Sequence, residues 1–286
     1  MLKQLPIYSP EEFESQKHPF SIKRLSTTIG AELHDIDLKK DLSQEEKDHI
    51  YNALLTYKVI FFRDQDISTE QHMRFGQYFG ELEIHPFAPL GTNREDHPEV
   101  LRITHNEDNK PKENAWHSDV TWRMEPSLGS ILRMVETPSV GGDTLFANME
   151  AAYENLPDEI KEKLEGAKAV HDFALFRNRL IKQGKSPEEI EEFDKKFPKP
   201  THPVIRTHPD TGKNLFMLML LLQPILKVSL MRIQGLCLTS YTIKLPSQNI
   251  NAVLSGRKTQ LPFGIIELVN IMQPVIIGQQ LEELSV

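Results

Sequence analysis

The chain has 286 residues, of which 39% are hydrophobic and 26% are charged, and this excludes a disulfide-stapled mini-protein, a fibrous protein and a disordered chain. Its net charge of -8 argues against nucleic acid as a partner, because a polyphosphate would be repelled. The single cysteine, Cys237, cannot form an internal disulfide, the N-terminus lacks a secretory signal, and no apolar run reaches the roughly 20 residues that span a bilayer, so we expect a cytoplasmic protein without membrane contact.

Two helices and a buried strand are predicted within the first 80 residues. Residues 43–57 carry apolar residues near helical spacing, with Ser43 as the N-cap and Glu46 completing a capping box. Residues 58–62 (KVIFF) form a short β-branched and aromatic run, which is typical of a buried strand. A second helix is expected from Ser68 to Gly80, with the glycine at its C-terminal cap.

Short strands dominate the middle of the chain. Residues 129–136 (GSILRMVE) and 143–148 (DTLFAN) have strand-like patterns and are separated by a Pro/Gly turn. Residues 148–165 predict two helical pieces, because Pro157 must begin a new turn. Residues 201–207 predict another strand, closed by a turn over 209–212. Helices followed by many short strands favour an α+β fold with a β-sandwich or barrel core.

The stretch 177–200 is dense in Lys, Glu and Pro, and we expect it to form most of an exposed insertion over about 171–200. Two interpretations remain open for it. It is either a solvated surface segment or a lid over a pocket.

An imidazole and a carboxylate, His117 and Asp119, stand two positions apart. On an extended segment, positions i and i+2 share a face, so both side chains can reach one ion. Such a pair supplies two of the three ligands of the 2-His-1-carboxylate facial triad, which leaves open positions on Fe(II). By itself the pair is a weak signal, because a surface strand can carry His and Asp at this spacing by chance.

Several further motifs surround this pair in a fixed order. They are residues 30–32 (GAE), 61–65 (FFRDQ), 75–81 (FGQYFGE), 85–86 (HP), 116–119 (WHSD), 141–146 (GGDTLF), 152–156 (AYENL) and 202–212 (HPVIRTHPDTG). Together they resemble the taurine dioxygenase family of Fe(II)/2-oxoglutarate-dependent dioxygenases. The likeness runs from about residue 20 to residue 216.

The resemblance implies a fold and a set of site residues. The fold is a double-stranded β-helix, or jelly-roll, core with flanking helices. His117 and Asp119 would bind iron, Thr144 would hydrogen-bond a carboxylate of 2-oxoglutarate, and His85 would lie in the substrate pocket. Two alternatives stay open: Thr144 as a residue that only fills a strand, and His85 as a loop residue without a role.

The resemblance also implies a reaction. The cofactors would be Fe(II), 2-oxoglutarate as cosubstrate and O₂, and a small organic substrate would be oxidised with release of succinate and CO₂. The partner is then a small molecule, and a homo-oligomer is compatible with the sequence. Taurine is disfavoured as substrate, because Glu113 stands where taurine-cleaving members carry Asn and would repel a sulfonate. Another sulfonate, a sulfate ester or a carboxylate fits the sequence.

The last 70 residues depart from the family. All 11 histidines, every Asp and both Trp precede residue 217, and only eight charged residues follow residue 216. The family places its second ligating histidine in a downstream segment resembling W-D-N-R-x-x-x-H, followed by an Arg that binds 2-oxoglutarate. This chain has no histidine after His208, so the triad cannot close in the usual way.

A shifted reading frame explains this departure. When codons are formed over residues 262–272 from the third base of each residue and the first two of the next, permitted wobble bases give F-W-D-N-R-A-C-Q-H-Y. The same shift gives Y-W-P-A-T-R-R-V-E-R over residues 276–286 and V-N-V-A-F-T from residue 217. We therefore interpret residues 1–216 as a dioxygenase domain whose remainder is replaced by an out-of-frame segment, 217–286.

Two consequences follow for the chain as written. We expect exposed sheet edges and an unfilled core where the C-terminal strands of the jelly roll are replaced. The alternative to an active dioxygenase is a catalytically inactive product that lacks the second histidine ligand and the arginine.

Overall fold

A computed structural model describes residues 8–85, 93–94, 96–105, 117–136, 144–172, 174–217, 251–254, 261–265, 269–272 and 282–285. The helices in these ranges are α1 (Pro10–Glu14), α2 (Gln44–Tyr57), α3 (Thr69–Gln77), α4 (Met149–Glu154), α5 (Asp158–Leu164), α6 (Ala174–Lys182) and α7 (Pro187–Lys196). None of the helices in the described ranges is long and apolar enough to cross a membrane.

The strands are short and lie before, between and after these helices in the sequence. They are β1 (Ser21–Arg24), β2 (Ala31–His34), β3 (Val59–Phe62), β4 (Asn93–Arg94), β5 (His97–His105), β6 (Gly129–Ile131), β7 (Arg133–Glu136), β8 (Thr144–Asn148), β9 (Lys168–Val170), β10 (Thr201–Pro203), β11 (Ile205–Thr207), β12 (Asn214–Phe216), β13 (Asn251–Leu254), β14 (Leu261–Ile265), β15 (Val269–Met272) and β16 (Glu282–Ser285).

Local sequence signals account for the first two long helices. In α2 the Ser43 hydroxyl accepts from the backbone N–H of Glu46, and the Glu46 carboxylate accepts from the backbone N–H of Ser43, as the capping box predicts. Ser68 caps α3 in the same way. The predicted C-terminal cap at Gly80 is wrong, because α3 ends at Gln77 and Tyr78 takes the cap position with a right-handed backbone.

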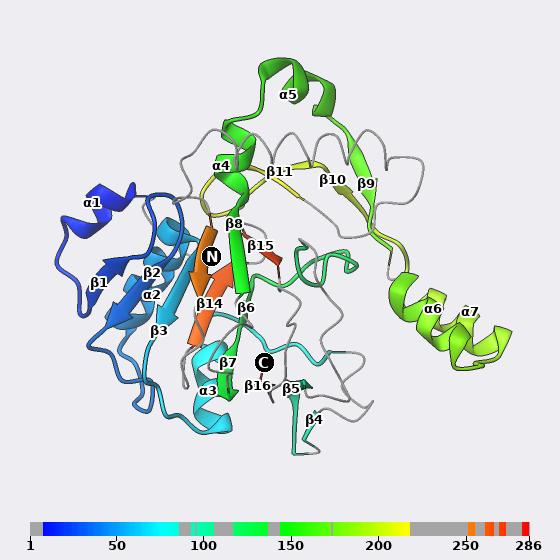
Figure 1. The fold of residues 1–286 in the computed structure, drawn as a ribbon, viewed down its shortest axis with the longest axis horizontal. Helices are drawn as coiled ribbons and strands as arrows, with labels where there is room; N and C mark the ends of the chain where they lie inside the picture. Colours follow the sequence, from blue (N-terminus) through cyan, green and yellow to red (C-terminus); the bar gives the residue numbers. More distant parts are fainter. Residues whose placement is uncertain are drawn as a thin grey trace.

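The largest described sheet has the strand order β1-β2-β3-β14-β6. β3 is buried along its whole length, as its apolar run predicts, and pairs in parallel with β2 and antiparallel with β14. Two smaller sheets follow the orders β13-β8-β15 and β4-β5-β16-β7. In Figure 1 the five-stranded sheet begins with β1 on the left of the view, β8 and β15 lie near the centre, and α6 and α7 lie at the right edge.

The four strands after residue 217 all pair with strands of the first part of the chain. β14 lies between β3 and β6, β13 and β15 flank β8, and β16 lies between β5 and β7. The expectation of exposed sheet edges is therefore wrong for β3, β5 and β8, which are paired on both sides, whereas β6 and β7 end their sheets in the described part of the chain. Backbone pairing needs only an extended segment, whatever side chains that segment carries.

The hydrophobic core that the structure describes comes from residues before 218. It includes Phe61 and Phe62 of β3, which contact Phe146 of β8 and Phe75 of α3 edge to face. Its last described member is Met217. This core places β3, β8 and α3 against one another and supports the segment between them that carries the candidate site.

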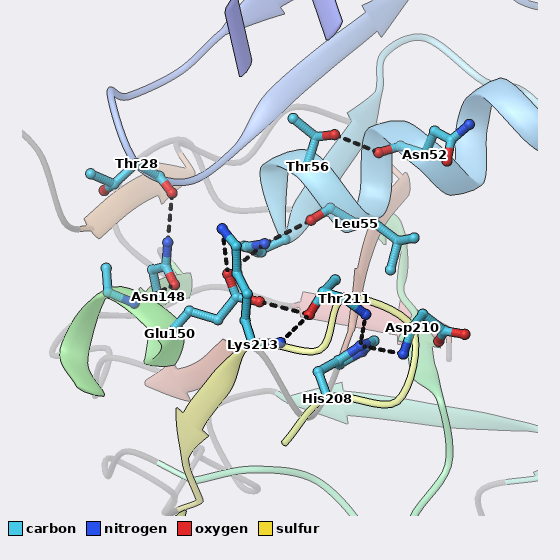
Figure 2. Close-up of polar contacts among 12 residues, drawn as sticks. Thr28, Asn52, Leu55, Thr56, Asn148, Glu150, His208, Asp210, Thr211 and Lys213 are labelled. Carbon is cyan, nitrogen blue, oxygen red and sulfur yellow. Dashed lines mark hydrogen bonds and ion pairs between the residues drawn. The ribbon is translucent and has the colours of Figure 1, made fainter. Parts of the chain in front are cut away.

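A polar network locks the C-terminal end of α2 to α4 and to the β11–β12 turn (Figure 2). The carboxylate of Glu150, only 3% exposed, lies 2.8 Å from the Lys58 ammonium and accepts from Thr211 Oγ1 at 3.3 Å. Lys58 also donates to the carbonyl of Leu55 at 2.7 Å. Burial lowers the pKa of Lys58, an effect that the Glu150 carboxylate opposes.

The expected insertion forms a helical hairpin, α6–α7, which projects from the sheets in Figure 1. α7 has no fully buried residue. Arg177 of α6 bridges the carboxylates of Asp172 and Asp194 at 3.3 and 3.4 Å, and Lys199 lies 3.0 Å from Asp172. These ion pairs fix the base of the hairpin and hold its two helices together.

Candidate active site

The two predicted metal ligands are in direct contact. Nε2 of His117 lies 3.1 Å from Oδ1 of Asp119, and both side chains are partly exposed, at 24% and 31%. His117 forms an isolated β-bridge, whereas Asp119 begins a turn that runs to Trp122. We expected both residues to lie on one extended segment. In the structure the contact instead forms where the extended backbone ends and the turn begins.

The turn after Asp119 has an unusual backbone. Val120 adopts φ +44°, which is costly for a β-branched residue, by about 1–3 kcal/mol. The neighbouring carbonyls of Thr121 and Arg123 each lie 2.9 Å from Nε2 of His202, which must therefore donate to them. This contact spans 81 positions of sequence and ties the turn to β10.

Asp119 is held from both sides. Ser130 of β6 donates to its Oδ2 at 3.1 Å, while His117 contacts its other oxygen. Burial raises the pKa of Asp119, but the hydrogen bonds from His117 and Ser130 outweigh this effect, so its pKa is below the usual value. The side chain is thus a carboxylate at neutral pH and suits a divalent cation.

A cavity of about 540 Å³, the inner cavity, adjoins this pair. Val120, which follows Asp119 in sequence, and Ser130, which donates to its carboxylate, line this cavity together with His85. The other lining residues come mainly from α3 and the segment after it, from β5, and from residues 127–131. His85, which the resemblance placed in the substrate pocket, lies on the wall of this cavity, and its role in binding substrate stays a prediction.

Two residues that line the inner cavity, Glu83 and Ser127, belong to a polar cluster with Arg123 that the sequence did not indicate. Glu83 accepts from Arg123 Nε at 2.7 Å and from Ser127 Oγ at 2.7 Å. Burial lowers the pKa of His85, with a smaller opposing effect from Glu83, so the imidazole is neutral near pH 7. A neutral imidazole can donate or accept a hydrogen bond to a bound substrate.

The remaining histidines singled out by the sequence are bonded to the backbone. His202 donates to the two carbonyls described above, and Nδ1 of His208 accepts from the backbone N–H groups of Asp210 and Thr211. Thr144 is the first residue of β8 and lies opposite Leu254 of β13. Its side chain is half-buried.

The donor types of His117 and Asp119 suit iron. An imidazole and a carboxylate in contact match two positions of a facial triad. Among the described residues, no third His, Cys, Asp or Glu joins them. The described residues therefore fit an Fe(II) site in part, with two of its three protein ligands.

Residues 21–226 match the model of the taurine catabolism dioxygenase family, TauD/TfdA. The chain belongs to this family.

Two named relatives are similar to this chain over most of its length. An "alkylsulfatase" of Acinetobacter baylyi is 34% identical over 69% of this chain and 62% of its own length. An "alpha-ketoglutarate-dependent sulfate ester dioxygenase" of Pseudomonas putida is 32% identical over 88% of this chain and 77% of its own length. The chain thus spans less than two thirds of the first relative.

A solved structure shows the same TauD/TfdA fold. The taurine dioxygenase of Burkholderia xenovorans is 27% identical, covers 93% of this chain and 89% of its own, and superposes with a TM-score of 0.72. The expected jelly-roll, cupin-like core with flanking helices is confirmed by this likeness.

Proposed function

We propose that the chain carries the fold and metal ligands of an Fe(II)/2-oxoglutarate-dependent dioxygenase whose substrate is a small sulfate ester. The observation that carries this proposal is the contact of His117 with Asp119 beside the inner cavity, in a chain of the TauD/TfdA family. Fe(II) bound there would supply the oxidising chemistry with O₂ and 2-oxoglutarate. The proposed ligands are His117 and Asp119, with Thr144 on a carboxylate of 2-oxoglutarate.

The chain's own residues perform the remaining tasks. Ser130 orients the Asp119 carboxylate, and His202 holds the turn that follows it. His85 faces the inner cavity as a neutral imidazole and would donate a hydrogen bond to an anionic substrate group. Met73 of α3 and Val100 and Leu101 of β5 would pack against the apolar part of a bound substrate and exclude water from it.

A sulfate ester is favoured over the sulfonates and carboxylates that the sequence also allowed. Two relatives carry sulfate esters or alkyl sulfates in their names, at 32% and 34% identity. Glu113 still disfavours taurine. The proposal therefore takes a sulfate monoester, whose oxidation at the ester-bearing carbon gives an unstable product that releases sulfate.

We further propose that residues 217–286 translate a shifted frame of the same domain. The loss of His and Asp after residue 216, the alternative reading W-D-N-R-A-C-Q-H and the end of the family match at residue 226 support this. The match to the Pseudomonas putida relative covers 88% of the chain and so extends beyond residue 217. Restoring the frame would supply a histidine near residue 270 as the third ligand.

Anaerobic Fe(II) titration in the presence of 2-oxoglutarate tests both proposals. The chain as written is compared with a restored-frame chain, and Asp119→Ala of each serves as control. We expect a metal-to-ligand charge-transfer band at one equivalent in the restored-frame chain, a weak or absent band in the chain as written, and none in either Asp119→Ala variant. A full band in the chain as written would overturn the shifted-frame proposal. No band in a folded restored-frame chain would overturn the iron site itself.

A further inference from the structure

A second cavity, the outer cavity, lies next to the inner one and has a volume of about 700 Å³. His85 lines both cavities and therefore stands at their boundary. The walls of the outer cavity come from the segment just after Asp119 and from the end of α7. The lining residues that matter here are Ile84, Trp122, Arg123, Met124, Lys196 and Phe197.

The outer cavity carries exposed apolar side chains. Ile84 is 51% exposed and Met124 is 67% exposed, and these are two of the four large hydrophobic residues found exposed in the described part of the chain. Beside them the rings of Trp122 and Phe197 meet edge to face, with centroids 5.4 Å apart. Clustered exposed apolar groups at a cavity mark a surface that is covered by an apolar ligand.

The two cations of this cavity are already engaged by neighbours. Arg123 Nη2 lies 2.7 Å from Glu83, and its guanidinium lies over the Trp122 ring, 4.8 Å from the centroid. The Lys196 ammonium lies 5.5 Å from the centroid of the Phe197 ring. The charge of Arg123 is balanced by Glu83, and the ammonium of Lys196 is matched by the acidic side chain of Glu125 in the same lining, so the outer cavity has no excess of positive charge to bind a second anion.

The two walls are fixed to each other. His202, which follows the hairpin in sequence, donates to the carbonyls of Thr121 and Arg123 on either side of Trp122. The hairpin itself is clamped by Arg177 between Asp172 and Asp194. Phe197 is therefore held against Trp122 by two independent anchors, and the width of the outer cavity is set by the fold.

We propose that the outer cavity holds the hydrocarbon tail of the substrate and that Phe197 is a specificity-determining residue for tail length. This inference rests on the proposed function, since it assumes that the reacting head group lies in the inner cavity beside Asp119. His85 stands where head and tail join. The α6–α7 hairpin then serves as the element that selects substrates by their apolar end.

The test measures binding of alkyl sulfates through tryptophan fluorescence, without iron or turnover. The chain has two tryptophans, so Trp116→Phe leaves Trp122 in the cavity wall as the only reporter. Ethyl, butyl and octyl sulfate are titrated below the micelle concentration. Each fully buried methylene contributes about a fourfold gain in affinity, so octyl sulfate should bind at least about tenfold more tightly than butyl sulfate even in a partly open cavity.

Variants in the same background locate the tail. Phe197→Ala and Met124→Ala should each reduce octyl sulfate affinity about fivefold or more and leave ethyl sulfate affinity unchanged. Ile181→Ala is the matched control, because it removes an apolar side chain, 53% exposed, from the same hairpin outside the cavity. Met124 is so exposed that its truncation does not threaten folding, so the test survives if Phe197→Ala fails to fold.

The outcomes separate this inference from the proposed function. Chain-length dependence that both cavity variants weaken, and that Ile181→Ala leaves intact, supports the tail site. Octyl affinity that is equal to butyl affinity, or that is insensitive to Met124→Ala, overturns it, as does concentration-dependent dimerisation that blocks octyl binding. If the charge-transfer band is absent while octyl sulfate still binds through its tail, the iron site of the proposed function is overturned and the tail site stands.

Discussion

His202 is the residue whose contacts the local sequence least reveals. Its Nε2 is the described donor to the carbonyls of Thr121 and Arg123, and Thr121 is 2% exposed. We expect His202→Leu to lower the free energy of unfolding by about 1–3 kcal/mol, because a buried carbonyl loses its donor. His202→Gln can still donate and should lose less. Urea unfolding followed by Trp122 fluorescence measures both, and equal losses in the two variants would contradict the assigned role.

At the residue scale, the sequence predicted what is close in sequence. His117 and Asp119 are two positions apart, so their contact follows from chain geometry and is found at 3.1 Å. The supports of this pair come from distant segments, Ser130 of β6 and His202 of β10. The motif over residues 202–212 contains His202 but does not indicate its contact with Thr121 and Arg123, because hydrogen bonds across the fold leave no local pattern.

At the scale of elements, the Lys58–Glu150 pair joins α2 to α4 (Figure 2). We expect Glu150→Leu to cost about 3–5 kcal/mol, because it leaves the buried ammonium of Lys58 without its carboxylate. The double variant Lys58→Met, Glu150→Leu removes both charges and should lose less than the single variant. A double-mutant cycle by chemical denaturation measures the coupling. Additive losses would show that the pair is not energetically coupled.

The α6–α7 hairpin offers a matched comparison of buried and exposed ion pairs. Arg177→Met removes the bridge between Asp172, which is 7% exposed, and Asp194. We expect faster hydrogen exchange in residues 187–196. Lys195→Met breaks an exposed i,i+4 pair with Glu191 and should cost less than about 0.5 kcal/mol, with unchanged exchange. If both variants exchange alike, Arg177 is not the clamp.

Elements with strong local signals were predicted well and their junctions were not. The capping boxes at Ser43 and Ser68 mark the starts of α2 and α3, and Pro157 separates α4 from α5 as expected. The strand predicted over 201–207 is split at Val204. Its backbone N–H donates to Ala167 and its carbonyl accepts from Met217, so the chain changes partners there. Such a change depends on tertiary pairing and has no sequence signature.

At the scale of the whole molecule, sheet order is the least predictable feature. β14 pairs with β3 although about 200 residues separate the two strands in sequence. β14 also belongs to the segment after residue 216 that departs from the family pattern. The motifs up to residue 216 identified the fold because they are ordered along one domain. The codon pattern after residue 216 indicated that the segment with the second histidine ligand is missing. The strands β13 to β16 pair through their backbones but carry no histidine that could serve as this ligand.

The whole fold should be sensitive to acid through its buried histidines. Burial lowers the pKa of His72, His171 and His208 to about 4, and they are 5%, 0% and 1% exposed. As pH falls, these imidazoles take up protons near pH 6.5 in the unfolded chain but only near pH 4 in the folded chain. The stability that is present above pH 6.5 is therefore lost as pH falls towards 4. Each histidine contributes up to about 3 kcal/mol to this loss.

His171→Phe isolates one of these contributions. Neither ring nitrogen of His171 has a hydrogen-bond partner among the described residues, so a phenyl ring can replace it without breaking a bond. We expect the variant to match the parent, or exceed it, in free energy of unfolding at pH 7, and to lose less stability between pH 6.5 and about 4.5. Urea unfolding at several pH values measures both slopes. Parallel slopes would show that the buried imidazole takes up no proton on unfolding, and so that acid sensitivity arises from other groups.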